Sequence, residues 1–267
     1  MTHFLETQFQ FISKAFQRSI AYKLEYYTGL ANAFLYIFIF TSVWKTVAVE
    51  SPSSLGIWNE NSLINYAILS TLIKVSYGRN EYLLVNKIKS GDIAYDILKP
   101  YSIFVMYISD SLGVSAFQLF ARALPLLIFS IFFFGIIPDV SILLFLKFLP
   151  AYIFSFFLFL LFGFFISSLA FFFTEVFSFS ILYSALVTLL SGSVIPITFF
   201  PDRFTDYIAW SPFPYLYYYP TAIILNMPIS IPYNEILFRY LVQITIISVL
   251  TLVIYRSGIK KMEFAGG

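Results

Sequence analysis

The stretch TGLANAFLYIFIFTSVWKTVAV, residues 28–49, is mostly apolar and carries a single charge, at Lys45. A helix needs about 20 mostly apolar residues to cross the hydrocarbon core of a bilayer, which is about 30 Å thick. Residues 28–49 therefore predict a transmembrane helix.

The composition of the whole chain agrees with a membrane protein. Hydrophobic residues make up 60% of the 267 residues and charged residues only 11%, whereas a soluble domain is about 45–50% apolar and about 25% charged. The excess apolar surface must face lipid. The chain has no cysteine and one histidine, His3, which excludes disulfides, thiolate nucleophiles and Cys/His metal sites. The net charge of +2 is too small to suggest nucleic acid as a partner.

Five further apolar runs predict additional spans. They cover approximately residues 61–78, 113–137, 141–171, 176–197 and 236–255. The run at 141–171 is long enough to tilt or break inside a bilayer. We therefore expect an all-α integral membrane fold with six transmembrane helices, organised as a single domain over residues 1–267.

The lysines and arginines outside these spans are distributed unevenly. Ten fall on one side of the predicted membrane, and Arg203 alone falls on the other. Because Lys and Arg accumulate in cytoplasmic loops, we expect both termini and the loop at 79–101 to be cytoplasmic. The ten residues are Lys14, Arg18, Lys23, Arg79, Lys87, Lys89, Lys99, Arg256, Lys260 and Lys261.

Residues 1–27 precede the first span and have a helical pattern of their own. Phe9, Ile12, Phe16 and Ile20 recur at helical spacing, and polar residues fall largely on the opposite face. This pattern predicts an amphipathic helix in the cytoplasmic interface. The helix either anchors the first span or is an elbow helix that also contacts a cytoplasmic partner, and the two roles are compatible.

The loop at 79–101 is charged and contains helix-ending residues. EYLLVNKIK (81–89) can form a short helix with Leu84 and Ile88 one turn apart. Gly91 suits a left-handed position after a helix, Asp92 can cap a second helix, and Pro100 helps to stop it. The loop is either a polar hairpin between spans or a docking surface that shows apolar residues to the cytosol.

The connection at 195–232 is apolar but interrupted by proline. Each proline removes a backbone donor, and unpaired backbone groups cost several kcal/mol each in lipid. We therefore expect short re-entrant helices that dip back from the outer face, packed against protein, rather than a seventh span. Tyr215, Tyr217, Tyr218 and Tyr219 would lie at the headgroup level. The interrupting residues are Pro196, Pro201, Pro212, Pro214 and Pro220.

Three segments resemble permease subunits of bacterial ABC exporters of the second permease class. They are SGDIAYDILKP (90–100), the proline-rich VIPITFFPDRFTDYIAWSPFPYLYYYP (194–220) and the tail GIKKMEFAGG (258–267). Their order and spacing extend the resemblance over most of the chain. The family more often has arginine at the position of Lys99 and leucine at that of Tyr101.

The resemblance implies a permease in the bacterial plasma membrane that pairs with a second copy or a sister permease. It also implies that residues 79–101 contain a coupling helix that docks on a cytosolic ATP-binding subunit. The sequence has no G-x-x-x-x-G-K-[ST] motif, so we expect no cofactor in this chain and ATP on the partner. The residues expected to contact that partner are Leu83, Leu84, Ile88, Gly91, Asp92 and Pro100.

Several charges fall inside or beside the predicted spans, where charge is costly. Lys74 and Asp110 could pair at one depth, although snorkelling of Lys74 to the interface is the reading we favour. Arg122 either makes a structural pair, contacts a partner subunit or lies in the substrate path. Glu175 is expected to be a solvated charge in a short turn.

The resemblance also places residues 195–220 above an exit path, where Pro196, Phe199 and Pro201 could form an outer gate or an inert cap. Two other classes of protein remain alternatives to a permease of this kind. A stand-alone carrier or channel is favoured by inverted repeats, and an integral membrane enzyme by clustered Asp, His or Cys at one membrane face. Neither feature is evident in the sequence. The substrate is not predicted.

Overall fold

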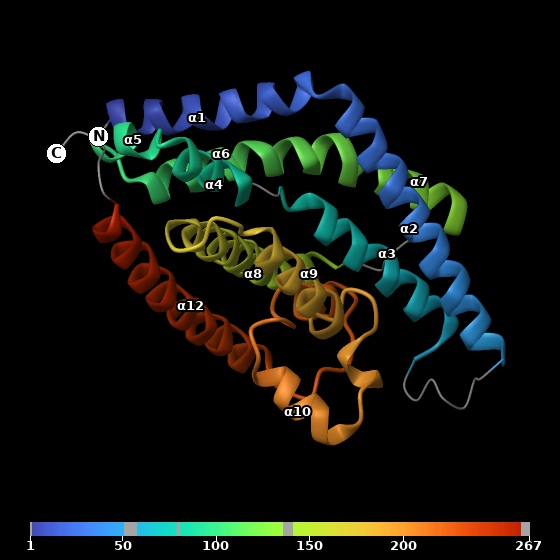
Figure 1. The fold of residues 1–267 in the computed structure, drawn as a ribbon. Coiled ribbons are helices and arrows are strands. Elements are labelled where there is room, and N and C mark those ends of the chain that lie inside the picture. Colours follow the sequence, from blue (N-terminus) through green and yellow to red (C-terminus); the bar gives the residue numbers. More distant parts are fainter. Residues whose placement is uncertain (1, 51–57, 79–80, 136–140, 263–267) are drawn as a thin grey trace.

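A computed structural model describes residues 2–50, 58–78, 81–135 and 141–262, in which every regular element is helical (Figure 1). Arg79, Ile137, Asp139 and the last five residues of the tail motif lie outside these ranges. The elements in chain order are α1 (Thr2–Ala21), α2 (Lys23–Glu50), α3 (Glu60–Ser76), α4 (Glu81–Ser90), α5 (Ile93–Ile97), α6 (Ile103–Gln118), η2 (Leu119–Ala123), α7 (Leu124–Phe134), α8 (Ile142–Ser168), η3 (Leu169–Phe171), α9 (Phe177–Leu190), η4 (Ile197–Phe199), α10 (Asp202–Trp210), α11 (Tyr218–Ile224) and α12 (Tyr233–Lys261).

Among the described residues, four helical stretches are long and apolar enough to cross a membrane. They are α2, the continuous stretch Ile103–Phe134, the stretch Ile142–Phe171, and α12. The other two predicted spans are shorter, since α3 has 17 residues and α9 has 14. At 1.5 Å per residue these helices are about 25 Å and 21 Å long. The all-helical membrane fold is confirmed, and six crossings stay a prediction.

The ends of the spans follow local sequence signals. α9 ends at Leu190 rather than near residue 197 because Gly192 adopts a left-handed conformation with φ of 76°. α8 starts where the Ser141 side chain accepts a hydrogen bond from the Leu144 amide at 3.2 Å. Pro150 lies inside α8 without breaking it. The stretch that begins at Ile103 starts ten residues before the predicted span at 113.

The N-terminal helix lies along α6 (Figure 1). Gly113 allows this close approach, because a Cβ at that position would collide with the Ile12 carbonyl and Ala15. Ser109 donates a hydrogen bond to the Gln8 side chain at 2.6 Å. The predicted helix is confirmed, and its apolar stripe is only partly buried, since Phe9 is 70% exposed whereas Phe16 packs against Phe117 of α6. Its position in a membrane interface remains a prediction.

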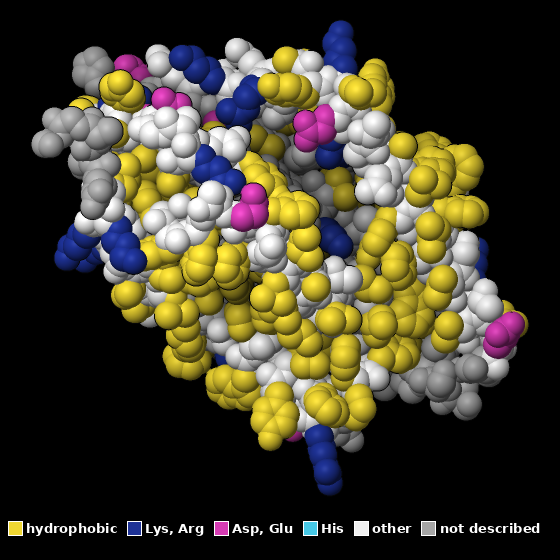
Figure 2. Space-filling model, viewed as in Figure 1, with side chains coloured by type: hydrophobic (Ala, Val, Ile, Leu, Met, Phe, Trp, Pro, Cys, Tyr) yellow, Lys and Arg dark blue, Asp and Glu magenta, His cyan; other side chains and the backbone are white. Residues whose placement is uncertain are grey.

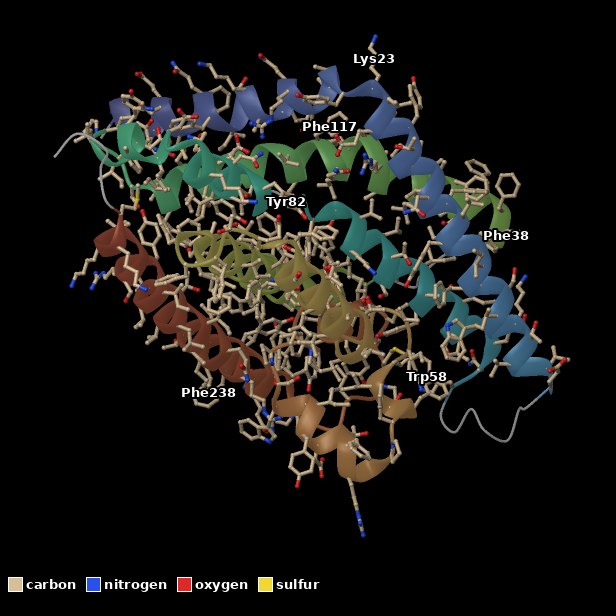
Figure 3. The ribbon with its side chains drawn as sticks, in the orientation of Figure 1. Lys23, Phe38, Trp58, Tyr82, Phe117 and Phe238 are labelled. Atoms are coloured by element: carbon tan, nitrogen blue, oxygen red, sulfur yellow. The ribbon has the colours of Figure 1, made fainter. Side chains whose placement is uncertain are left out.

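Aromatic and aliphatic side chains fill the centre of the bundle and also cover its outside. Tyr66, Tyr215 and Tyr240 are fully buried in one large cluster around α8. Phe38 on α2 and Phe238 on α12 point away from the bundle and are more than half exposed (Figure 3). Apolar side chains on both the inside and the outside of the helices are what a bilayer-embedded bundle requires.

Candidate functional site

The loop after α3 forms two short helices, as predicted. α4 and α5 are separated by Gly91, whose φ of 80° lies in the left-handed region. A Cβ at Gly91 would meet nothing within 4 Å, so glycine is required there for its backbone conformation and not for space. We call residues 82–100 the hairpin.

The prediction that Leu84 faces the cytosol is wrong. Leu84 and Ile93 are fully buried in a cluster with Tyr107, Leu160 and other residues of α6 and α8, and Ile88 packs against the same cluster with Leu83. The inward face of the hairpin is therefore used to join it to the bundle. Sequence periodicity identified the apolar stripe correctly but could not tell which neighbour covers it.

Asp96 holds the two halves of the hairpin together. Its side chain is 4% exposed and accepts hydrogen bonds from the ammonium groups of Lys87 and Lys99, the latter at 2.6 Å. Burial opposes ionisation of the carboxyl, but the two lysines outweigh burial and hold the pKa of Asp96 below its ordinary value. The hydrogen bond to Asp96 is also the main cause of a raised pKa for Lys99.

The outward face of the hairpin carries exposed apolar side chains. Leu98 is 84% exposed and Tyr95 is 70% exposed, next to exposed Gly91, Asp92 and Pro100. Asp92 does not cap α5 as predicted, because its side chain accepts a hydrogen bond from the Ser90 hydroxyl at 2.7 Å. The hairpin thus offers Leu98 and Tyr95 on a support fixed by Asp96 and the buried Leu84.

The connection before α12 consists of η4, α10 and α11, which confirms short helices packed against protein. Side chains of the spanning helices bond its irregular backbone. Tyr66 donates to the Gly192 carbonyl at 2.6 Å, Tyr240 to the Tyr215 carbonyl at 2.8 Å, and Gln243 to the Trp210 carbonyl at 2.7 Å. Side chains of the bundle thus satisfy backbone carbonyls of this proline-rich region.

The tyrosines predicted at headgroup level are buried inside the protein, and their depth in a membrane stays a prediction. Tyr215, Tyr217, Tyr218 and Tyr219 are all less than 5% exposed. Their rings pack against one another, against Tyr66 of α3 and Tyr77 at its C-terminal end, and against Tyr240 of α12. The exposed aromatic residues of this segment lie instead on α10. Those exposed residues are Phe204, Tyr207 and Trp210.

The structure separates the predicted gate residues from Arg122. Pro196 is buried, Pro201 is exposed, and the Phe199 ring lies 5.3 Å from Trp44 of α2 and 5.8 Å from Trp58. Arg122 contacts α2 near Gly29. Fifteen residues of helix separate Gly29 from Trp44, a distance of about 22 Å. These residues therefore form two sites and not one.

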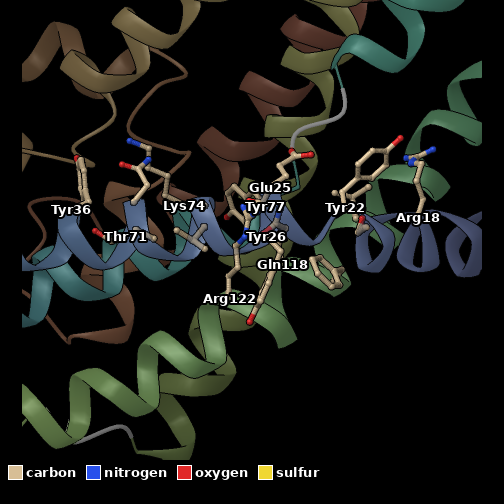
Figure 4. A pocket seen from close by; sticks show the side chains of 17 residues that line it. Arg18, Tyr22, Glu25, Tyr26, Tyr36, Thr71, Lys74, Tyr77, Gln118 and Arg122 are labelled. Carbon is tan, nitrogen blue, oxygen red and sulfur yellow. Dashed lines mark hydrogen bonds between the residues drawn. The ribbon is translucent and has the colours of Figure 1, made fainter.

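A cavity of about 620 Å³ opens between α1, α2, α3 and the α6–η2 junction. Figure 2 shows a hollow at this junction with basic side chains visible inside it, and Figure 4 shows the lining residues. Three basic residues and one acidic residue line it, namely Arg18, Lys74, Arg122 and Glu25. Arg18 is paired with Asp110 at 2.6 Å, and basic side chains outnumber acidic ones among the residues that line the cavity.

Arg122 reaches the cavity from a π-helical turn, η2 (Figure 4). Its Nη2 donates to the Glu25 backbone carbonyl at 2.7 Å. A Cβ at Gly29 would collide with the guanidinium, so glycine lets Arg122 lie against α2. π-helical turns insert one residue into a helix and are frequent at functional sites.

Three buried polar atoms belong to residues of the cavity wall and have no hydrogen-bond partner within the described chain. They are Tyr36 Oη, Gln118 Oε1 and Arg122 Nε. A buried polar group without a partner costs about 1–3 kcal/mol. The cavity wall therefore contains buried polar groups whose hydrogen bonds are not made within the described chain.

The remaining charges differ in part from the predictions. Asp110 pairs with Arg18. Lys74 lies in the last turn of α3, and its ammonium lies 5.2 Å from the centroid of the Tyr36 ring, near the middle of α2. Glu175 is largely exposed as expected, and its carboxylate accepts a hydrogen bond from the Phe177 amide at 3.2 Å.

Comparison with known families decides the class of this protein. A sequence model of the family described as ABC-2 family transporter protein matches residues 26–266. The chain belongs to that family. Membership in the ABC-2 family identifies this protein as a permease subunit of a membrane transporter. A comparison with curated proteins gave no match.

Sequence reasoning missed several residues of this ABC-2 permease that line the cavity. Tyr36 and Gly29 carried no signal beyond being part of a span. Gln118 and Arg122 are polar residues four apart in an otherwise apolar run, and that spacing places both on one helix face. Arg122 was identified from the sequence, and a search for a second polar residue on its helix face would have found Gln118 as well. Among the described residues no group of three or more His, Asp or Glu side chains could hold a metal ion.

Proposed function

We propose that this ABC-2 permease is the membrane subunit of an ATP-driven exporter. In this proposal it forms the translocation path with a second permease, identical or related, in the bacterial plasma membrane. Separate ATP-binding subunits dock on the hairpin and drive transport. Family membership supports the permease role, and the exposed pair Tyr95 and Leu98 on a rigid support is the observation that points to docking at the hairpin.

The hairpin is suited to transmit force as well as to bind. Its tip presents Leu98 outward, while Leu84 and Ile93 insert between α6 and α8. A partner that moves the tip also moves the side chains that contact these two long helices, because packed interiors transmit displacement instead of absorbing it. The Asp96 ion pairs keep the two short helices from separating under that load.

Substitution at the hairpin tip tests the docking proposal. We expect Tyr95→Asp with Leu98→Asp to abolish co-purification with the ATP-binding subunit, because each buried apolar side chain contributes about 1.5–3 kcal/mol. Transport should fall while membrane insertion is retained. Leu84→Asp is unsuitable for this test because it would unfold the hairpin.

Tyr207→Asp on α10 is the matched control, since Tyr207 is 80% exposed and lies in the outer connection. It should keep the ATP-binding subunit. A double tip variant that still co-purifies with an active ATPase and transports normally would remove the docking proposal. Purified wild-type permease that transports without any ATPase would favour a stand-alone carrier.

We also propose six crossings with both ends of the chain in the cytoplasm. The hairpin, the start of α1 and the end of α12 lie at one end of the molecule, where Phe11, Ile93 and Met262 share one cluster (Figure 1). α1 would then be an elbow helix in the cytoplasmic interface. Reporter fusions after Gly267 and near Glu60 should give opposite orientations, and equal orientations would contradict the topology.

The outer connection is proposed to act as a gate through Phe199 and the prolines beside it. The Phe199 ring lies against Trp44 and Trp58, so movement of η4 would have to break these contacts. Because the chain has no cysteine, Phe199→Cys gives clean labelling. Its reaction with an impermeant thiol reagent should change when ATP is trapped on the partner. Unchanged reactivity would leave this segment as an inert cap.

A further inference from the structure

The cavity at the α1–α2 junction has the chemistry of an anion site. Its wall holds Lys74 and Arg122, and the nearest acidic side chain on the wall, Glu25, is exposed at the rim. The Arg122 guanidinium is half-buried among apolar helices, where a positive charge is stable only with a compensating partner. Its hydrogen bond within the described chain goes to the neutral Glu25 backbone carbonyl, and the exposed Glu25 carboxylate is the one acidic side chain of the described wall that acts on its charge.

The unpartnered polar atoms narrow the class of ligand. Arg122 Nε and Tyr36 Oη are donors, and they suit the oxygen atoms of a phosphate. Gln118 Oε1 is an acceptor and needs a hydroxyl or amino group beside that phosphate. These three atoms lie just beneath the cavity surface, so small side-chain rotations are needed before they meet a ligand.

The position of the cavity favours a ligand that is at home in a bilayer. Its lining extends along α2 from Glu25 to Tyr36, near the middle of the helix. Exposed apolar side chains flank it on α2, among them Leu24 and Leu35. A volume of about 620 Å³ is within the range of about 300–1,000 Å³ that small-molecule sites occupy.

We propose that this cavity binds a phosphate ester that bears a hydroxyl group, as found in the headgroup of an anionic glycerophospholipid. Arg122 and Lys74 bind the phosphate, Tyr36 donates a further hydrogen bond to it, and Gln118 accepts one from the hydroxyl. Gly29 keeps the space in which the guanidinium lies. This inference does not depend on the docking of an ATP-binding subunit.

The test uses the purified full-length chain with phosphatidylglycerol as the probe and phosphatidylcholine as the zwitterionic comparison. Bound lipid is counted by native mass spectrometry over a lipid titration. Wild-type protein should prefer phosphatidylglycerol. Arg122→Gln and Lys74→Met should each weaken its binding about tenfold, because each removes a charge-assisted hydrogen bond. Arg122→Lys should retain most of the binding.

Lys147→Met is the matched control, since the Lys147 ammonium also lies over a tyrosine ring, 6.0 Å from the Tyr233 centroid, but outside the cavity. It should bind phosphatidylglycerol as wild type does. Gln118→Leu, which keeps every charge, should reduce the preference for phosphatidylglycerol over phosphatidic acid. Thermal unfolding of each variant identifies those that fail to fold, and Lys74→Met and Gln118→Leu carry the comparison if Arg122→Gln is among them.

Competition with soluble glycerol 3-phosphate distinguishes a free phosphate ester from the phosphate of a lipid headgroup. If it displaces phosphatidylglycerol at millimolar concentration, the site accepts a free phosphate ester. If it does not, the acyl chains are required and the ligand is a lipid. The proposal is overturned if phosphatidylcholine binds equally well, or if Arg122→Gln and Lys74→Met bind phosphatidylglycerol no more weakly than Lys147→Met.

Discussion

The hairpin and the outer connection, residues 195–232, expose and bury the opposite side chains from those that their compositions indicate. The hairpin is charged, yet its tip exposes Tyr95 and Leu98, while one of its carboxylates, that of Asp96, is buried. The outer connection is rich in tyrosine and proline, yet it buries Tyr215 and its neighbours and exposes α10. The comparison shows that composition indicates where a segment can lie, whereas the neighbouring helices of the fold determine which of its side chains are buried.

The largest expected effect comes from removing one tyrosine from each region. Tyr215 is fully buried, with ring centroids 4.6 Å from Tyr219 and 4.9 Å from Tyr240. Tyr215→Ala should lower the free energy of unfolding by about 3–5 kcal/mol, as for other large buried aromatic residues. Tyr95→Ala should change it by less than about 0.5 kcal/mol.

Denaturant unfolding in detergent micelles, followed by tryptophan fluorescence, measures both variants. Equal losses of stability would break the comparison, because they would mean that Tyr95 is as buried as Tyr215. Retained stability in both would show that the tyrosine cluster does not hold the outer connection.

Two glycines with similar backbone conformations sharpen the comparison. Gly91 and Gly192 have φ of 80° and 76°. A Cβ at Gly91 would meet open space, whereas one at Gly192 would lie 2.8 Å from Tyr218 Cβ. Gly91→Ala should cost about 1–2 kcal/mol from backbone strain alone. Gly192→Ala should cost about 1–3 kcal/mol more because of overpacking.

The same unfolding assay compares these two alanine variants. Since both substitutions impose similar backbone strain, the difference between them isolates the packing around Gly192. A Gly91→Ala variant that is the less stable of the two would contradict this account.

The Asp96 ion pairs give the hairpin a pH dependence that the outer connection lacks. The pKa of Asp96 is lowered in the folded state. Its stabilising contribution is therefore present above the unfolded pKa of about 3.9, and it is lost as the pH falls through the folded value. Asp96→Asn should cost about 1–2 kcal/mol at pH 7, since Lys87 and Lys99 are partly exposed and screened.

Proteolysis of the hairpin between pH 7 and pH 3 checks the loss. Wild type should become more susceptible at the acidic end, and Asp96→Asn should be susceptible throughout. Asp92→Asn is the control, because Asp92 lies in the same loop, is exposed and forms no ion pair that the described residues show. If Asp92→Asn behaves as Asp96→Asn does, the effect is one of net charge.

The smallest effect on stability is expected from two cysteine substitutions. They test on which side of the membrane the hairpin and the outer connection lie. Tyr95→Cys and Asp206→Cys replace exposed residues and should leave the fold unchanged. An impermeant thiol reagent added outside intact cells should label Asp206→Cys only. Labelling of both from outside would contradict the proposed topology.

These comparisons also define how far sequence reasoning reaches. Periodicity and length predicted the helices, the two-part hairpin and the proline-broken connection, because each depends on residues close together in the chain. Burial of Leu84 and Tyr218 was missed, because it depends on neighbours from distant helices. The Arg18–Asp110 pair joins residues 92 apart, and charge spacing within one span could not select it over Lys74.

The π-helical turn at Leu119–Ala123 has a consequence for the history of this family. One residue inserted into a helix turns everything after it by about 100° about the axis. Deleting a single residue from the turn would restore regular α-helix and carry Arg122 away from Gly29. Relatives that lack the insertion would present another residue to α2, however similar the flanking sequence. The length of this turn, more than the presence of an arginine, would therefore show which relatives inherited the basic cavity.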